Sequence, residues 1–174
     1  MSDHVKDIIK TICTYALIIF SVIVLRIFFI DPVRVDGKSM NTTLENGEIM
    51  ILNKIVYKKY DIQRFDIVVI KKNNKLIIKR VVGLPGEVIE YKDNQLYIDG
   101  KKVNDPYPST RTDDFSIQDV GHTKVPGDTY FVMGDNRSNS LDSRFPEVGV
   151  IKKSDILGRA RFVIWPINRL GRVK

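Results

Sequence analysis

The sequence predicts a mainly β protein: a single N-terminal transmembrane helix, then an antiparallel β-sheet or barrel-like domain with a small insertion. Three observations lead to this fold class. The run from Thr11 to Leu25 carries no charge, the remainder of the 174-residue chain alternates short β-forming segments with turn residues, and no long stretch beyond residue 30 has helical periodicity. This length suits one modest folded domain.

Residues 8–30 form the predicted membrane anchor. Only Lys10 and Arg26 interrupt the apolar run, which is long enough for the roughly 20 residues that a bilayer span needs. A buried core helix would show a polar face, and a cleaved secretory signal would end in small residues, whereas this run continues into "IFFIDPVRVDG". An uncleaved anchor is therefore the favoured interpretation. Cations lie at both ends of the span, so the positive-inside rule does not orient it.

Charge and composition narrow the possible ligands. The formal net charge is +7, which on a tethered domain fits attraction to anionic lipid head groups. The basic residues are spread over strands and turns without a basic helix or an aromatic ladder, so we expect no nucleic-acid binding. The only cysteine, Cys13, lies in the predicted span, and the histidines are His4 and His122. These are too few for a zinc centre, and we expect neither metal nor cofactor.

The soluble part is predicted as a series of short strands. The segment 86–103 has the pattern of a hairpin that turns at 93–94, with a second turn at 99–100. Residues 104–127 are polar and rich in turn formers, which indicates a surface loop or a small insertion. The other segments with strand patterns are 48–54, 65–70, 75–82, 128–135 and 156–166.

The strand "KLIIKRVV" (75–82) carries two adjacent cations, Lys79 and Arg80, in an otherwise apolar segment. Successive side chains point to opposite faces of a strand, so whichever face is buried carries a charge. The simpler explanation is an edge strand whose lysine amine reaches water. The alternative is a buried lysine whose pKa is lowered by desolvation. Such an amine is a competent general base, and serine–lysine pairs are a known variant of the hydrolytic triad.

Two further segments contain candidate reactive residues. In "VDGKSMNTTL" (35–44), Ser39 follows Gly37, and the Ser39 amide could face a developing oxyanion. Serine in such a position is also a common cap of a turn or short helix. The segment "GDNRSNSLDSR" (134–144) follows a predicted strand directly, and taken alone it also fits a solvated loop.

In combination, "GKSM", "IIKRVVGLPGE" and "MGDNRSNSLDSR", in this order behind an N-terminal anchor, resemble the type I signal peptidases of bacteria, in particular the Gram-positive branch. The resemblance extends through "RFDIVVI" to "ILGRARFVIWP". It implies a membrane-anchored serine endopeptidase that removes signal peptides from exported preproteins, cleaving after small residues of the A-x-A type. The implied division is a cytoplasmic tail and anchor (1–30) and an extracytoplasmic peptidase domain (31–174) with an insertion at about 88–126, in a type II single-pass orientation in the cell membrane.

The resemblance also implies roles for individual residues. Ser39 matches the nucleophile, Lys79 the general base, and Ser140 a second serine that orients the lysine amine. Gly37 stands where some relatives place an oxyanion-hole hydroxyl. A polar scaffold around the site corresponds to Asp135, Arg80, Asp142 and Arg144, with Asp135 expected to pair with Arg80. The expected walls of the substrate pocket are Val33, Val35, Met40 and Ile78.

One departure from the family pattern is Thr42, where relatives usually have proline, and this loosens the backbone of the nucleophile segment. The implied partners are secretory preproteins, the phospholipid membrane and, by proximity, the Sec-type translocation machinery. Two alternatives belong to other classes. Soluble self-cleaving repressors of the same serine–lysine clan would carry a DNA-binding helix-turn-helix instead of a span, and a membrane-anchored binding module would need neither Ser39 nor Lys79.

Overall fold

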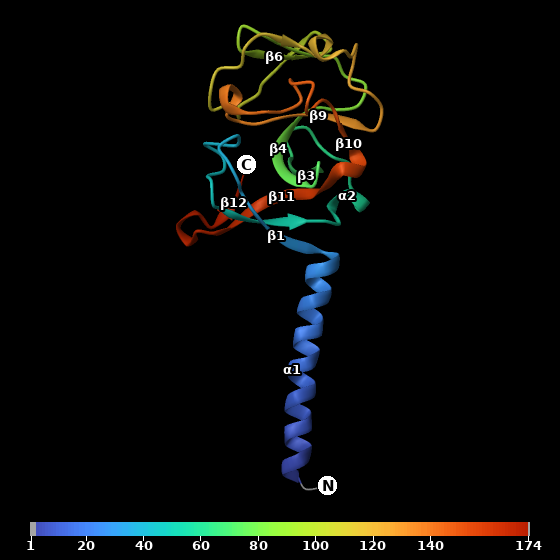
Figure 1. Ribbon diagram of the computed structural model, residues 1–174, viewed down its shortest axis with the longest axis vertical. Coiled ribbons are helices and arrows are strands. Elements are labelled where there is room, and N and C mark those ends of the chain that lie inside the picture. The colour runs from blue at the N-terminus through green and yellow to red at the C-terminus, as the bar shows by residue number, and fades with distance from the viewer. Residues whose placement is uncertain (1–2, 174) are drawn as a thin grey trace.

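The computed structural model describes residues 3–173, and its N-terminal helix stands apart from the rest of the protein (Figure 1). Helix α1 (Asp3–Phe28) contains the segment His4–Val24, which is long and apolar enough to cross a membrane and is not buried against the domain. Within it, the hydroxyl groups of Thr11, Thr14 and Ser21 each donate to the carbonyl oxygen four residues earlier. These polar side chains therefore need no water. The helix ends slightly before the predicted residue 30, because Ile30 already belongs to a strand.

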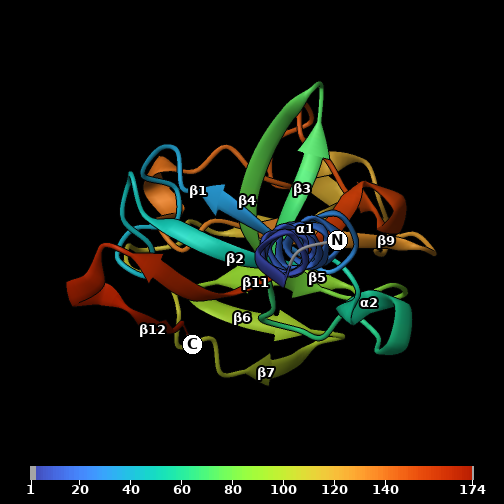
Figure 2. The same cartoon turned by 90° about the horizontal axis from the view of Figure 1, so that it is seen from below.

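The larger sheet is antiparallel throughout and open, so the mainly β fold class is confirmed, but the sheet does not close into a barrel. Its strands follow the order β1-β2-β11-β3-β4-β9-β10, and β12 pairs with β11. Seen along α1, the β3–β4 hairpin runs steeply across β2 and β11, which shows how strongly the sheet is twisted (Figure 2). The strands are β1 (Ile30–Arg34), β2 (Ile49–Asn53), β3 (Ile67–Lys72), β4 (Lys75–Gly83), β9 (Thr129–Met133), β10 (Ile151–Lys152), β11 (Ile156–Trp165) and β12 (Gly171–Arg172).

The smaller sheet lies at the end of the domain farthest from α1 (Figure 1). It has four antiparallel strands in the order β7-β6-β5-β8, namely β5 (Ile89–Lys92), β6 (Gln95–Ile98), β7 (Lys101–Val103) and β8 (Phe115–Ser116). Asp93 and Asn94 have φ values of 51° and 62°, and Asp99 and Gly100 have 51° and 74°. Both turns fall where the sequence predicts them, because these residue types tolerate positive φ.

Several short elements escape the sequence patterns. Strand β1 is one, because Pro32 lacks an N–H and argues against a strand at this point of the sequence. The proline is tolerated because β1 lies at the edge of the sheet. The small helices were not expected either, because single turns carry no periodicity. They are α2 (Val56–Lys59), η1 (Ile117–Val120), η2 (Arg137–Asn139), η3 (Lys153–Asp155) and η4 (Ile167–Arg169).

Strand β4 lies at the centre of the hydrophobic packing. Ile78 belongs to a core cluster with Val33, Val82 to the cluster shared with the smaller sheet, and Val81 to a third cluster that includes Val132 of β9. Every residue from Ile78 to Gly83 is buried. The strand is therefore covered on both faces, and the two cations in its middle are excluded from water.

Candidate active site

Lys79 is buried rather than at a solvated edge. It pairs in register with Val68 of β3, and only 4% of its surface is exposed. Its amine nitrogen Nζ donates a hydrogen bond of 3.2 Å to Ser140 Oγ. The simpler explanation from the sequence, an edge-strand lysine whose amine reaches water, is therefore wrong.

Burial changes the protonation of this lysine. Desolvation is the largest effect and lowers the pKa of Lys79 from 10.5 to about 8; the nearby Arg144 cation also lowers it, while the carboxylates of Asp142 and Asp135 raise it. At pH 7 a group with a pKa near 8 is neutral in about a tenth of the molecules, against about one in 3,000 for an ordinary lysine. Lys79 is thus poised to accept a proton near neutral pH.

Ser39 lies in the turn that follows β1, and the loop between β9 and η2 holds its backbone. Its carbonyl oxygen accepts a hydrogen bond from Asn136 N (3.0 Å), and Asn136 Nδ2 donates to the neighbouring Lys38 O (3.1 Å). Within residues 3–173, the amide N–H and the hydroxyl of Ser39 form no hydrogen bond. Both groups are available to a substrate.

Gly134 allows the reactive segments to meet. A Cβ at this position would lie 2.3 Å from Ser140 Oγ and 2.4 Å from the Ser39 carbonyl oxygen, closer than any side chain could be accommodated. Glycine is required here by the close approach of two chain segments. The structure therefore brings together the Ser39 backbone, Ser140 and, through Ser140, the Lys79 amine.

The segment 134–144 is held by its own ion pair and is not a solvated loop. Asp142 has no exposed surface, accepts from Gly134 N (3.0 Å) and forms an ion pair with Arg144 Nε (2.8 Å). Arg144 Nη2 also donates to the carbonyl oxygen of Arg137 (2.7 Å). These bonds fix the backbone around Ser140, which in turn contacts Lys79.

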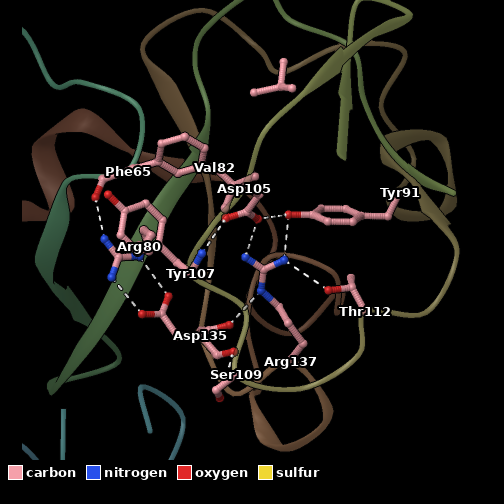
Figure 3. Close-up of polar contacts among 12 residues, drawn as sticks. Phe65, Arg80, Val82, Tyr91, Asp105, Tyr107, Ser109, Thr112, Asp135 and Arg137 are labelled. Atoms are coloured by element: carbon pink, nitrogen blue, oxygen red, sulfur yellow. Dashed lines mark hydrogen bonds and ion pairs between the residues drawn. The ribbon is translucent and has the colours of Figure 1, made fainter. Parts of the chain in front are cut away.

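The expected pair of Arg80 and Asp135 is present and completely buried. Arg80 donates to both carboxylate oxygens of Asp135, at 2.9 and 2.7 Å, and neither side chain has exposed surface. The guanidinium also donates to Phe65 O (2.8 Å) and stacks 3.6 Å from the Tyr107 ring centroid (Figure 3). A bidentate, stacked guanidinium of this kind satisfies the buried charge.

Arg137 is a functional candidate that the sequence reasoning missed. It is 2% exposed, and its Nε donates to the carbonyl oxygen of Gly134 (3.0 Å). From the smaller sheet and its loop, Tyr91 Oη and Asp105 Oδ2 accept from its guanidinium at 2.6 and 2.7 Å (Figure 3). Its place in the "GDNR" string was the available signal. Its partners lie too far away along the chain for sequence spacing to identify them.

The four expected pocket residues lie in one core cluster, and each is at most 8% exposed. Of these four, Val33 also lines an open hollow of about 590 Å³, together with Leu52, Leu76 and Leu157. Gly37 has a φ of +92° with nothing within 4 Å of a Cβ position, and its N–H is already bound by Asn46 Oδ1 at 2.9 Å. The Gly37 amide is therefore not free to bind a substrate.

Two strand edges border this hollow and lack partners. Strand β1 pairs only with β2, and β9 pairs with β4 only from Arg80 onward, so residues 75–79 have one open edge within the described structure. The hollow is lined from β1 by Asp31–Val33 and from β4 by Leu76. An extended peptide could hydrogen-bond to either edge. Among residues 3–173 no group of three or more His, Cys, Asp or Glu side chains could hold a metal ion.

A buried lysine and two serines around one glycine, on an open β-sheet, is the kind of site that a hydrolase uses, and comparisons with known proteins identify the class. The family model described as "Signal peptidase, peptidase S26" matches residues 5–165. The chain therefore belongs to the S26 peptidases.

Relatives place the chain among the bacterial type I signal peptidases. Signal peptidase I of Bacillus amyloliquefaciens is 41% identical, covering 87% of this chain and 85% of the relative. Signal peptidase I S of Bacillus subtilis strain 168 is 39% identical, covering 95% and 93%. A crystal structure of a signal peptidase I from Enterococcus faecalis V583 is similar with a TM-score of 0.52 and 35% identity, covering 57% of this chain and 97% of that one. The chain is an enzyme of this family, whose activity is the removal of signal peptides.

Proposed function

We propose that this chain is a membrane-anchored endopeptidase that processes exported preproteins with Ser39 as nucleophile and Lys79 as general base. The observation that carries the proposal is the burial of Lys79, with its pKa lowered to about 8, beside Ser140 and the Gly134 contact to Ser39. A lysine normally stays protonated at neutral pH, and burying one without a carboxylate in contact is costly. A catalytic requirement for the neutral amine explains that cost.

The reaction begins when the neutral amine of Lys79 accepts the proton of the Ser39 hydroxyl. The Ser39 oxygen attacks the carbonyl carbon of the scissile bond, and the free amide of Ser39 stabilises the oxyanion. The lysine then gives its proton to the leaving amine, and an acyl-enzyme remains. Water, deprotonated by the same amine, attacks the ester, and Lys79 returns this proton to the Ser39 oxygen as the signal peptide leaves with a new carboxyl terminus. Ser140 keeps the amine oriented through both steps.

The open edges of β1 and β4 support a proposal for how the substrate binds. A preprotein segment that lies extended between these edges forms main-chain hydrogen bonds, and its alternate side chains point toward the core cluster. Val35, Met40 and Ile78 are at most 8% exposed, so each offers only a small apolar surface to a substrate side chain. The proposed preference is for small residues of the A-x-A type, as in the family that the chain resembles.

The apolar helix α1 supports a membrane location. Strand β1 begins almost where α1 ends, and Ser39 lies shortly after β1, so cleavage takes place near the membrane surface. The proposed orientation is type II in the cell membrane, with 1–30 as tail and anchor and 31–174 outside the cytoplasm. The partners are then secretory preproteins, the phospholipid membrane and the neighbouring Sec-type machinery, without nucleic acid or cofactor. Protease added to spheroplasts should digest the domain, and full protection would reverse the orientation.

The decisive experiment uses the full chain in detergent with a preprotein and follows the cleavage products. Ser39→Ala and Lys79→Ala should each abolish cleavage while circular dichroism shows an intact fold. His122→Ala is the matched control and should cleave normally, because His122 lies outside the site. Activity within a few-fold of wild type for either Ser39→Ala or Lys79→Ala would refute the assignment of nucleophile and base. An inactive His122→Ala variant would instead favour a histidine-dependent site.

A further inference from the structure

The segment that carries Ser39 is a closed loop with a defined base. We call residues 36–48 the nucleophile loop. At its base, Val35 N donates to Glu48 O (2.8 Å) and Gly47 N donates to Val35 O (2.9 Å). On the side of Ser39, Asn136 binds the loop through two backbone carbonyl oxygens. The opposite side of the loop, from residue 43 to 48, is held by a different part of the chain.

That part is Arg169, in the single turn η4 near the C-terminus. Its Nη2 donates to Thr43 O (3.1 Å) and its Nη1 donates to Glu45 Oε1 (3.1 Å). Its Nε lies 2.5 Å from Glu48 Oε1 in an ion pair. One guanidinium thus contacts the loop at three points, and these contacts connect residues more than 120 positions apart in the sequence.

The buried carboxylate of Glu48 depends on Arg169 for its counter-charge. Its side chain is only 2% exposed, and its second oxygen, Oε2, accepts from Glu45 N (3.0 Å). In the described structure Arg169 is the only cationic side chain within ion-pair distance of Glu48. A buried carboxylate without its cation is strongly destabilising. The loop base and η4 are therefore coupled energetically as well as in space.

Thr43 connects this contact to the other half of the site. Its carbonyl oxygen accepts from Arg169, while its hydroxyl donates to Asp135 Oδ2 (2.5 Å). Asp135 holds Arg80, the residue that directly follows Lys79 in β4. A continuous set of hydrogen bonds therefore runs from Arg169 through Thr43 and Asp135 to the strand that carries Lys79.

We propose that Arg169 is a positioning residue for the peptidase reaction: it fixes the nucleophile loop so that the Ser39 hydroxyl is presented to Lys79. The inference rests on the proposed roles of Ser39 and Lys79, and it adds a residue outside all the matched motifs. Arg169 acts through Thr43 and Glu48 and touches no reacting atom. A displacement of about 1 Å between reacting groups can cost about a hundredfold in rate, so loss of this contact should act on the chemical step.

The test compares three variants of the full chain in detergent. Arg169→Met removes every donor but keeps an unbranched apolar stem. Arg169→Met combined with Glu48→Gln also removes the buried carboxylate that the single variant leaves without a cation. Arg172→Met is the matched control, because Arg172 is exposed and forms no ion pair within residues 3–173. For each variant, kcat and KM for preprotein cleavage, the pH dependence of kcat/KM and the Tm are measured.

The expected result separates positioning from stability. Arg169→Met should lower kcat about 10- to 100-fold with KM changed less than about twofold, and its Tm should fall. The double variant should regain most of the Tm but keep the low kcat, because the bond to Thr43 O is still missing. The pH midpoint should stay near that of wild type in both, since the surroundings of Lys79 are unchanged. Arg172→Met should behave like wild type.

Two results would overturn the inference. A kcat that recovers together with the Tm in the double variant would show that Arg169 only stabilises the fold. A normal kcat in folded Arg169→Met would show that the contact does not matter for the reaction. Failure of the proposed function looks different, because wild type and Arg172→Met would then also fail to cleave, or Ser39→Ala would cleave normally.

Discussion

The two sides of strand β4 each bury a cation, and they accommodate it in opposite ways. On one side Arg80 has no exposed surface and forms two hydrogen bonds to the equally buried Asp135. On the other side Lys79 is 4% exposed, and its amine has the hydroxyl of Ser140 as its hydrogen-bond partner. Arginine cannot lose its proton in a protein, so its burial requires a counter-charge, whereas lysine can become neutral.

The difference shows how one strand serves two purposes. Asp135 compensates Arg80, and this pair ties β4 to the loop that begins at Gly134. Lys79 is left without a carboxylate in contact, so desolvation dominates and its pKa falls to about 8. The carboxylates of Asp142 and Asp135 still act on Lys79 from a distance, but their effect is smaller than that of burial. Adjacent residues of β4 thus carry a cation compensated by a carboxylate and a lysine whose pKa is lowered by burial.

The sharpest test exchanges the cation on the Lys79 side. Lys79→Arg keeps a long cationic side chain but cannot supply a neutral base, so kcat/KM should fall by about 10²- to 10⁴-fold. The value of kcat/KM is measured by preprotein cleavage in detergent, and circular dichroism verifies that the variant is folded. Lys101→Arg, at an exposed position of β7 in the smaller sheet, is the control and should be fully active. An active Lys79→Arg enzyme would mean that residue 79 acts as a fixed cation.

The next largest effect should come from removing the counter-charge on the Arg80 side. Asp135→Asn leaves a buried guanidinium without its carboxylate and should destabilise the domain by about 3–5 kcal/mol, measured by urea unfolding. Asp61→Asn is the control; Asp61 is 88% exposed and 4.0 Å from Lys153, and its loss should cost at most about 1 kcal/mol. Equal losses in the two variants would show that the buried pair compensates nothing.

A double variant sharpens this point. Arg80→Met with Asp135→Leu removes both charges and should be more stable than Asp135→Asn, because no buried charge is left uncompensated. It should nevertheless process preprotein poorly, since the Thr43 hydroxyl loses its acceptor on Asp135.

The pH dependence of the reaction tests the Lys79 side without any substitution. The base is active when neutral, so kcat/KM should rise with pH through a single ionisation at about pH 8, falling about tenfold per pH unit below it. The contribution of Lys79 to folding stability should also increase with pH. The folded pKa lies below the unfolded value of 10.5, so Lys79 binds more protons in the unfolded chain between pH 8 and 10.5, and its own contribution to stability should rise with pH across that window. A rate that rises only near pH 10 would contradict burial as the cause.

Much of this contrast was predictable from the sequence. The tandem cations of "KLIIKRVV" suggested a buried lysine as the alternative to a solvated edge strand, and the resemblance of the motifs around Ser39, Lys79 and Ser140 to a peptidase family directed attention to these residues before any geometry was known. The turns at 93–94 and 99–100 followed from residue types that tolerate positive φ. Such features are local, since they depend on a few consecutive residues.

The features that were missed depend on contacts between distant segments. Nothing in the sequence pairs Arg137 with Asp105 and Tyr91, or Arg169 with Glu48, because single arginines and carboxylates are found all along the chain. The open sheet is a similar case. Strand patterns predict antiparallel pairing, but whether the first and last strands meet depends on the twist accumulated over the whole sheet. The sequence pattern therefore does not distinguish a barrel-like fold from the open sheet that is observed.

The smallest expected loss of activity comes from removing the Ser140 hydroxyl, which is the hydrogen-bond partner of Lys79 where Arg80 has a carboxylate. Ser140→Ala removes the hydrogen-bond partner of the Lys79 amine but leaves burial, and hence the lowered pKa, largely unchanged. One net hydrogen bond contributes about 1 kcal/mol, so kcat should fall about 5- to 10-fold with little change in KM or in the pH midpoint. Ser138→Ala is the control, because Ser138 is exposed two residues away in the same loop. A loss as large as that of Lys79→Arg would contradict a purely orienting role, and it would place Ser140 among the groups that transfer the proton.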